Sequence, residues 1–320
     1  MKKILVLGAG GQIGSELVPH LRSIYGANNV VATDVSSARC EKLAGEGPFE
    51  LLNALDGKIF NDVVRMYRID TIFNLVAVLS ATGESNPRMA WNVNIGAVTN
   101  SLHIGRENGC AVFTPSSIGA FGNDTPKVKT PQDTIQRAST TMYGVCKVAG
   151  ELLSDYYHYR FGVDTRSVRF PGLISYVTAP GGGTTDYAVE IFHAAVQEGA
   201  FTCNIKAGTY MDMMYMPDAL RSVVQLMEAD PAKLKHRNSF NIAAMSFDPE
   251  GIAAAIRQHI PDFRISYNVD PVKQAIADSW PDSMDDSCAR EEWGWEPTYD
   301  LPAMTRDMIE KVREKLSKSK

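Results

Sequence analysis

The chain has 320 residues, of which 44% are hydrophobic and 22% are charged, and its formal net charge is −5. These values are typical of a globular protein with one large domain, or with a domain and a smaller lobe. The acidic balance excludes nucleic acid as the main partner. The sequence has no apolar run long enough to span a bilayer, which excludes a membrane-spanning class.

Short apolar runs alternate with longer amphipathic stretches in the first half of the chain. The expected strands are residues 4–7, 29–33, 71–75 and 111–114, and the expected helices include residues 12–25 and 87–107. Strands that alternate with helices form a parallel sheet covered on both faces, and fully apolar strands suit such a sheet. We therefore expect an α/β fold with a Rossmann-like, doubly wound parallel sheet.

The loop after the first expected strand carries Gly8, Gly11 and Gly14 in the spacing G-x-x-G-x-x-G. Glycines let the backbone approach a pyrophosphate, and the following helix offers free N–H groups and a positive dipole end. Asp34 lies twenty residues after Gly14, and no arginine follows it until Arg39. A carboxylate there accepts hydrogen bonds from ribose hydroxyls and repels a 2′-phosphate. The pattern predicts a dinucleotide site that prefers NAD to NADP.

Ser116 and Ser117 follow the expected strand 111–114. The carboxyl end of a parallel strand faces the crevice where ligands bind, so a hydroxyl there can orient a substrate oxygen. The residues alone do not decide which serine is catalytic. We expect one to act on the substrate and the other to contact the cofactor.

Tyr143 and Lys147 are four residues apart in an expected helix that spans residues 141–159, so they share one face. A phenol is a poor base at neutral pH because its ordinary pKa is about 10. A positive charge about 4 Å away favours the phenolate by about 4 kcal/mol at an effective dielectric near 20. We expect Tyr143 to be the general base, assisted by Lys147 and the positive nicotinamide ring.

The pattern changes after about residue 175, where Gly181-Gly182-Gly183 precedes expected helices at 186–198, 217–228 and 249–259. We expect an NAD-binding domain at residues 1–175. Residues 176–320 should form mainly a smaller, less regular substrate lobe, with some segments returning to the first domain. The five cysteines and six histidines show no metal-ligand spacing, so we expect no metal, reduced thiols and a reducing compartment such as the cytoplasm.

These motifs together resemble the extended short-chain dehydrogenase/reductase family over the whole chain. The resemblance places Asn94 at the helix asparagine that supports a water path, and Ser117 at the catalytic serine with Ser116 beside it. Ala97 stands where glycine is usual, and Asn53-Ala54 where an acidic residue often meets adenine. The resemblance implies cofactor contacts from Gly8, Gly11, Gln12, Ile13, Gly14, Asp34, Asn53, Ala54, Leu75, Ala77, Asn94, Tyr143, Lys147 and Leu173.

Three sequence segments indicate a particular branch of this family. They are LSATGE at residues 79–84, PGGGTTDYA at 180–188 and SWPDSMDD at 279–286. They resemble the short-chain type of L-threonine 3-dehydrogenases, which use no zinc. This implies oxidation of L-threonine at C3 to 2-amino-3-oxobutanoate with reduction of NAD. The backbone of the glycine turn is expected to help bind the substrate carboxylate. The implied substrate contacts are Ser80, Ser117, Tyr143, Thr184, Thr185 and Trp280.

Two alternatives stay open at this point. A sugar-nucleotide epimerase or dehydratase of the same fold would hold NAD tightly and release no net NADH. A non-catalytic, NAD-sensing Rossmann protein would have no need for the tyrosine, lysine and serine pair. The resemblance also implies a homodimer, with helices 87–107 and 141–159 of each subunit at the interface.

Overall fold

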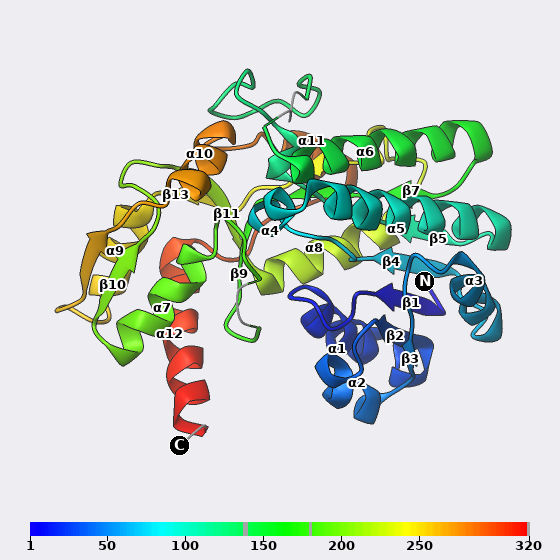
Figure 1. Ribbon diagram of the computed structural model, residues 1–320, viewed down its shortest axis with the longest axis horizontal. Helices are drawn as coiled ribbons and strands as arrows, with labels where there is room; N and C mark the ends of the chain where they lie inside the picture. Colours follow the sequence, from blue (N-terminus) through cyan, green and yellow to red (C-terminus); the bar gives the residue numbers. More distant parts are fainter. Residues whose placement is uncertain (137–139, 179–180, 319–320) are drawn as a thin grey trace.

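The computed structural model describes residues 1–136, 140–178 and 181–318. In this part of the chain the largest sheet has six strands, all paired in parallel, in the order β3-β2-β1-β4-β5-β7 (Figure 1). The strands are β1 (Ile4–Leu7), β2 (Val30–Asp34), β3 (Phe49–Leu51), β4 (Thr71–Asn74), β5 (Ala111–Phe113) and β7 (Thr165–Arg166). The strand order reverses between β1 and β4, which confirms the predicted Rossmann-like fold.

The sheet is buried on both faces. Alternate residues of β1 enter different cores: Ile4 and Val6 pack on one side, and Leu5 and Leu7 on the other. The first side is covered by α1 (Gly14–Tyr25) and α8 (Met216–Glu228), and the second by α3 (Gly57–Met66) and α5 (Pro87–Asn108). This double cover explains why an uninterrupted apolar run forms a strand here.

The two long helices α5 and α6 (Met142–Phe161) lie side by side (Figure 1). A polar side chain caps each one. Before α5, the Asn86 side chain accepts a hydrogen bond from the N–H of Met89 at 3.1 Å, which confirms the predicted helix start. Before α6, the Thr141 hydroxyl accepts one from the N–H of Gly144 at 3.0 Å. The second cap sets where α6 begins, and so fixes the residues of its first turn.

The rest of the chain forms smaller sheets and shorter helices. The remaining strands are β6 (Ser116–Ser117), β8 (Val168–Phe170) and β12 (Phe240–Asn241) in one sheet, β9 (Gly172–Ile174), β11 (Met211–Tyr215) and β13 (Met245–Phe247) in another, and β10 (Ala200–Cys203) with β14 (Arg264–Tyr267). The remaining helices are α2 (Glu41–Glu46), α4 (Ser80–Ser85), α7 (Tyr187–Gln197), α9 (Pro249–Arg257), α10 (Pro271–Ser279), α11 (Ser287–Trp293) and α12 (Leu301–Lys318).

The helices of the second half of the chain pack into two different hydrophobic cores. Helices α7, α9 and α12 share a core around Phe192, Ile252 and Met308. In contrast, α8 and α11 pack into the core of β1 and β2 through Met216 and Trp293. The boundary at residue 175 stays a prediction, but this packing shows which later segments contact the large sheet. No helix in the described ranges has the length and apolar character needed to cross a membrane.

Candidate active site

A cleft of about 560 Å³ lies at the carboxyl ends of β1 and β4, the two strands between which the strand order reverses. Small-molecule sites of this fold lie at these strand ends, and they have volumes of this size. Most of the predicted site residues line the cleft: Gly8, Gly11, Gln12, Ile13, Gly14, Leu75, Ala77, Ser80, Ser116, Ser117, Tyr143, Lys147, Leu173, Thr184, Thr185 and Trp280. Four predicted residues lie outside its lining: Asp34, Asn53, Ala54 and Asn94. Pro180, which begins one of the predicted substrate segments, is outside the described residues.

The glycine loop has the shape that a pyrophosphate site requires. A Cβ atom on Gly14 would lie 2.3 Å from the carbonyl oxygen of Gly8, and Gly8 itself has a φ of +76°. Glycine is therefore required at both positions, because any side chain would displace the loop from the start of α1. The backbone thus lies close to the cleft at the N-terminal end of a helix, where phosphate groups bind.

Asp34 ends β2 beside this loop and is 4% exposed. Its carboxylate accepts hydrogen bonds from the N–H groups of Gly10 and Ser36, both at 3.0 Å. It also pairs with the Arg39 guanidinium at 2.7 Å, and Arg39 lines the cleft. The predicted ribose side of the site therefore contains a carboxylate and, next to it, a cation that the sequence analysis did not assign to the site.

Asn53 and Ala54 follow β3. The Asn53 side chain accepts a hydrogen bond from the N–H of Leu55 at 3.0 Å. The carbonyl of Ala54 accepts one from the Asn100 side chain at 2.9 Å. These contacts attach the segment to its own turn and to α5. The adenine contacts assigned to the two residues stay predictions.

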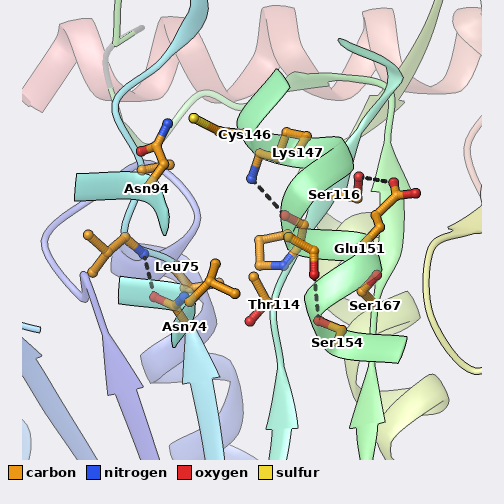
Figure 2. A pocket seen from close by; sticks show the side chains of 15 residues that line it. Asn74, Leu75, Asn94, Thr114, Ser116, Cys146, Lys147, Glu151, Ser154 and Ser167 are labelled. Carbon is orange, nitrogen blue, oxygen red and sulfur yellow. Dashed lines mark hydrogen bonds between the residues drawn. The ribbon is translucent and has the colours of Figure 1, made fainter. Parts of the chain in front are cut away.

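Two polar side chains fix the chain at the ends of β4 and β5. Asn94 is buried on α5; it accepts a hydrogen bond from the Val78 N–H at 2.7 Å and donates one to the Val78 carbonyl at 3.2 Å. Lys147 donates to the carbonyl of Pro115 at 2.7 Å (Figure 2). Its ammonium lies 5.3 Å from the centre of the Tyr143 ring. The lysine therefore faces the strand end and the tyrosine from one position on α6.

A polar cavity of about 30 Å³ lies beside Lys147 (Figure 2). Asn74 and Thr114 line it, and within the described ranges neither the Asn74 Nδ2 nor the Thr114 Oγ1 has a hydrogen-bond partner from the protein. A polar cavity of this size accommodates one water molecule, and buried polar atoms such as these are normally bonded to protein or water. The cavity therefore offers a place for a bound water between the lysine and the sheet.

The two serines point in different directions. The Ser117 hydroxyl accepts a hydrogen bond from the N–H of Gly119 at 3.0 Å. A Cβ on Gly119 would lie 3.4 Å from that hydroxyl oxygen and 3.2 Å from Cε1 of Tyr143, so the serine and the tyrosine flank the same glycine. Ser116 instead donates to Glu151 (Figure 2). The geometry favours Ser117 as the serine that shares an oxygen with Tyr143.

Glu151 and Arg169 form a buried ion pair behind Ser116, and each residue is 6% exposed. Arg169 donates to both carboxylate oxygens of Glu151, at 3.0 and 2.9 Å. The guanidinium also donates to the carbonyl of Gln132 and to the Asn241 side chain, at 2.9 and 3.0 Å. Full hydrogen bonding of this kind is what allows a charged pair to stay buried. The sequence offers no local sign of this network, because its members lie on α6, β8, β12 and a loop.

Polar side chains from the first and the second half of the chain meet in the part of the cleft lined by Ser80 and Thr184. The hydroxyls of Ser80 and Thr184 lie 3.5 Å apart. The N–H groups of Gly182 and Gly183 donate to the Asp186 carboxylate at 2.9 and 2.7 Å. Burial raises the pKa of Asp186, which lines the cleft and was missed as a site residue although it stands in a predicted segment. Because these two N–H groups are already paired, the hydroxyls are the better candidates for binding a substrate carboxylate.

The start of α1 holds the chain that leads to the glycine turn. The Ser15 hydroxyl lies 2.7 Å from the Thr178 hydroxyl, and the Ser175 hydroxyl donates to Glu16. Burial raises the pKa of Glu16 to about 7, although the Ser175 hydrogen bond and Lys315 act in the opposite direction. The helix that begins at the glycine loop is therefore also attached to the substrate side of the cleft.

Comparison with known proteins agrees with this geometry. Residues 4–243 match the model of the NAD dependent epimerase/dehydratase family, and the chain belongs to that family. An uncharacterized epimerase/dehydratase of Staphylococcus aureus is 56% identical over 98% of both chains. The family assignment confirms the predicted class and NAD as its cofactor.

Solved structures give a narrower likeness. The L-threonine dehydrogenase of Clostridium difficile is 56% identical, with a TM-score of 0.96 over 98% of both chains. The holo form of a GalE-like L-threonine dehydrogenase of Cupriavidus necator is 50% identical, with a TM-score of 0.92 over 97% of this chain and 99% of that one. A monomeric L-threonine 3-dehydrogenase from a metagenome is 40% identical, with a TM-score of 0.92 over the same shares.

Replacing Glu16 should change how stability depends on pH. Because its pKa is raised from 4.5 to about 7 in the folded protein, the folded state binds the proton more tightly and stability falls as pH rises through this window. We expect Glu16→Gln to unfold at a higher urea concentration than the wild type at pH 8, and the gain to disappear at pH 4.5 and below. Glu198→Gln, an exposed control, should show no such dependence, and an equal gain at both pH values would contradict the assignment.

Replacing Asp34 should change the choice of cofactor. Asp34→Ala removes the predicted acceptor for the ribose hydroxyls and breaks the ion pair with Arg39, so NAD affinity should fall about tenfold or more while NADP affinity rises. Titrations monitored by protein fluorescence would measure both affinities. The double variant Asp34→Ala/Arg39→Ala is the control, because it should lose the gain for NADP. Unchanged NAD affinity in Asp34→Ala would show that this carboxylate does not face the ribose.

Proposed function

We propose that the protein is an NAD-dependent L-threonine 3-dehydrogenase, which oxidises the C3 hydroxyl of L-threonine to the ketone of 2-amino-3-oxobutanoate. The observation that carries the proposal is the meeting of Ser117, Tyr143 and Lys147 in one cleft with the glycine loop and with Ser80 and Thr184. The high identity to L-threonine dehydrogenases over nearly the whole chain supports the same reaction.

In this mechanism the alcohol loses a proton from oxygen and a hydride from C3. Tyr143 accepts the hydroxyl proton as general base, and Ser117 hydrogen-bonds the same oxygen and directs it. Lys147 favours the phenolate through its charge. NAD, held at the glycine loop, supplies the acceptor for the hydride. In this proposal the proton passes from Lys147 toward solvent through the small cavity beside it. Asn94 is a positioning residue for this path, because it lines the cavity and its side chain holds Val78.

The substrate side of the cleft suits a small zwitterion. Ser80, Thr184 and Thr185 offer hydroxyl donors for the substrate carboxylate. Asp186 is the acidic side chain among the described residues of the lining, and it provides an acceptor for the ammonium group. Trp280 is 6% exposed and forms the apolar wall. A sugar nucleotide would need basic groups for its diphosphate on this side, whereas the acid here favours a substrate with a positive charge.

The decisive experiment is an NADH assay by absorbance with NAD and a panel of alcohols. We expect NADH to form with L-threonine at a rate far above that with L-serine or 3-hydroxybutyrate. A UDP-sugar should give none. Conversion of the UDP-sugar to an isomer without NADH release would favour an epimerase, and NAD binding without turnover on any compound would favour a sensor.

Tyr143→Phe tests the site within the same assay. Loss of the phenol should lower kcat by about 10²–10⁴-fold, the range for a general base, and leave NAD affinity nearly unchanged. Tyr210→Phe is the control, because Tyr210 is 48% exposed and does not line the cleft. Turnover near the wild-type value in Tyr143→Phe would contradict the assignment of the base.

We also propose that the protein is a homodimer that pairs α5 and α6 of each subunit. Large apolar side chains are exposed on these helices: Trp91 on α5 is 41% exposed, and Leu152, Tyr156 and Tyr159 on α6 are 63, 54 and 77% exposed. The last three recur at helical spacing, so they form one stripe beside α5. An exposed apolar stripe of this kind indicates a protein–protein contact.

Leu152→Glu should convert the dimer to a monomer, because it places a charge within the apolar stripe. Sedimentation velocity would measure the change in mass. Val272→Glu is the control, since Val272 is a similarly exposed apolar residue on α10, at 56%. A monomeric wild type, like the similar protein from the metagenome, would contradict the proposal.

A further inference from the structure

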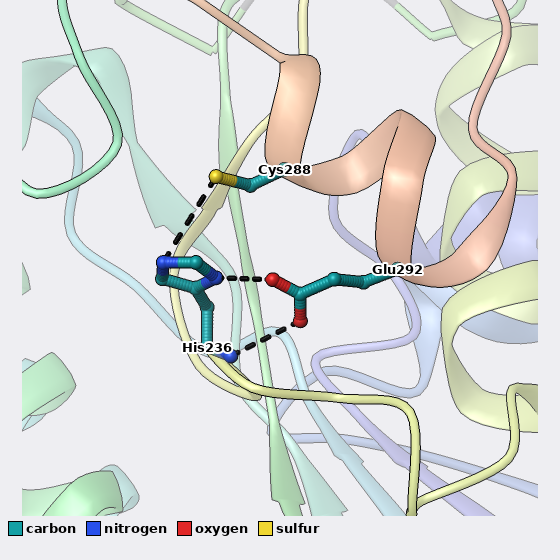
Figure 3. A group of neighbouring side chains, drawn as sticks. All are labelled: His236, Cys288 and Glu292. Atoms are coloured by element: carbon teal, nitrogen blue, oxygen red, sulfur yellow. Dashed lines mark hydrogen bonds and ion pairs between the residues drawn. The ribbon is translucent and has the colours of Figure 1, made fainter.

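Three side chains that can bind metal meet outside the cleft: His236, Cys288 and Glu292 (Figure 3). His236 lies in the loop between α8 and β12, and the other two project from α11. One ligand atom from each lies within 4.8 Å of the others. The sequence offers no sign of the group, because 52 positions separate His236 from Cys288.

Glu292 fixes the imidazole of His236. One carboxylate oxygen bonds to Nδ1 of the ring, and the other accepts hydrogen bonds from the N–H groups of Lys235 and His236 at 2.6 and 3.1 Å. A buried carboxylate at Nδ1 places the ring proton there and leaves the Nε2 lone pair available. Carboxylates hold histidine ligands in this way in metal sites.

The Nε2 atom faces two further side chains that can bind a metal ion. It lies 3.9 Å from Sγ of Cys288 and 3.4 Å from Oδ2 of Asp133, a residue of the loop before α6. Two ligands of a tetrahedral zinc ion, at metal distances of about 2.0–2.3 Å, lie about 3.5 Å apart. Both separations are close to that value, so an ion bound to Nε2 has the usual ligand spacing to Cys288. The Asp133 side chain is 83% exposed, and its rotation toward α11 would bring a third ligand to the same ion.

The surroundings of the thiol favour a cation. The carboxylates of Glu292, Asp133, Asp285 and Glu291 are near enough to act on the Cys288 side chain electrostatically. Negative charge gathered in this way attracts a divalent ion. Cys288 is also the half-exposed cysteine of the chain, whereas the other four are buried, so an ion can reach it.

We propose that His236, Cys288 and Asp133 bind one thiophilic divalent cation, for which Zn²⁺ has the matching ligand preference, with Glu292 as the residue that orients the histidine. The Cys288 thiol loses its proton to solvent as the metal–sulfur bond forms. The site is separate from the proton-transfer residues and supplies no step of the oxidation.

The position of Asp133 gives such an ion a structural consequence. Its neighbour Gln132 bonds Asn241 and Ser239 in the network behind Ser116, at 2.7 and 2.8 Å. Gln136, in the same loop, bonds Glu151 of that network. An ion that joins Asp133 to α11 would therefore stabilise the loop that precedes the catalytic helix.

The test uses Co²⁺ as a probe on the full chain after treatment with a chelator. We expect one Co²⁺ per chain with a thiolate-to-cobalt absorption band, displaced by Zn²⁺ and unaffected by Mg²⁺. Zn²⁺ should also raise the melting temperature of the wild type. Absence of the band in the wild type would overturn the proposal.

Variants assign the ligands. Cys288→Ser should abolish the band and the thermal shift, and His236→Gln should weaken Co²⁺ binding at least tenfold. Asp133→Asn, at a side chain 83% exposed and therefore safe for folding, should weaken it as well. His259→Asn, an exposed histidine outside the group, should bind as the wild type does. A band that persists in Cys288→Ser, or unchanged affinity in both His236→Gln and Asp133→Asn, would show that the ion binds elsewhere.

Discussion

The ion pair between Glu151 and Arg169 joins the parts of the chain that form the cleft. Glu151 lies on the helix that carries Tyr143 and Lys147, one turn after the lysine, and Arg169 lies on β8, which pairs with the serine strand β6. The pair is buried, so its charges are stable only with the complete set of hydrogen bonds around it. This requirement fixes the spacing between the serine strand and the tyrosine helix, and a proton transfer between their side chains depends on that spacing.

A fold of this kind can support different reactions, because cofactor binding and substrate binding fall to different segments of the chain. In the proposed function, the glycine loop provides cofactor binding and the Tyr143–Lys147 pair provides proton transfer. Ser80, Thr184 and Trp280, which line the cleft from other segments, are the residues that we propose distinguish an amino acid from a sugar nucleotide. Specificity can therefore change while the proton-transfer residues stay in place.

Much of this organisation could be predicted from the sequence, because it depends on local patterns. The buried strands, the glycine loop, the cap at Asn86 and the i, i+4 pair of Tyr143 and Lys147 are all encoded within a few neighbouring residues. Contacts between distant segments could not be predicted. Three such contacts depend on how the elements pack, which no local spacing specifies. They are the ion pair of Arg39 with Asp34, the hydrogen bond of Ser116 to Glu151 and the contact of His236 with Cys288.

The attachment of residues 175–178 to the first turn of α1 links two binding events through one rigid element. The backbone of the predicted pyrophosphate site and the chain that leads to the proposed substrate turn are both attached to Ser15 and Glu16. Suppose that a bound dinucleotide, acting through this attachment, changes the affinity for the substrate by some factor. A bound substrate must then change the affinity for the dinucleotide by the same factor. Cofactor and substrate are then thermodynamically coupled, and the saturation curve for either one depends on the concentration of the other.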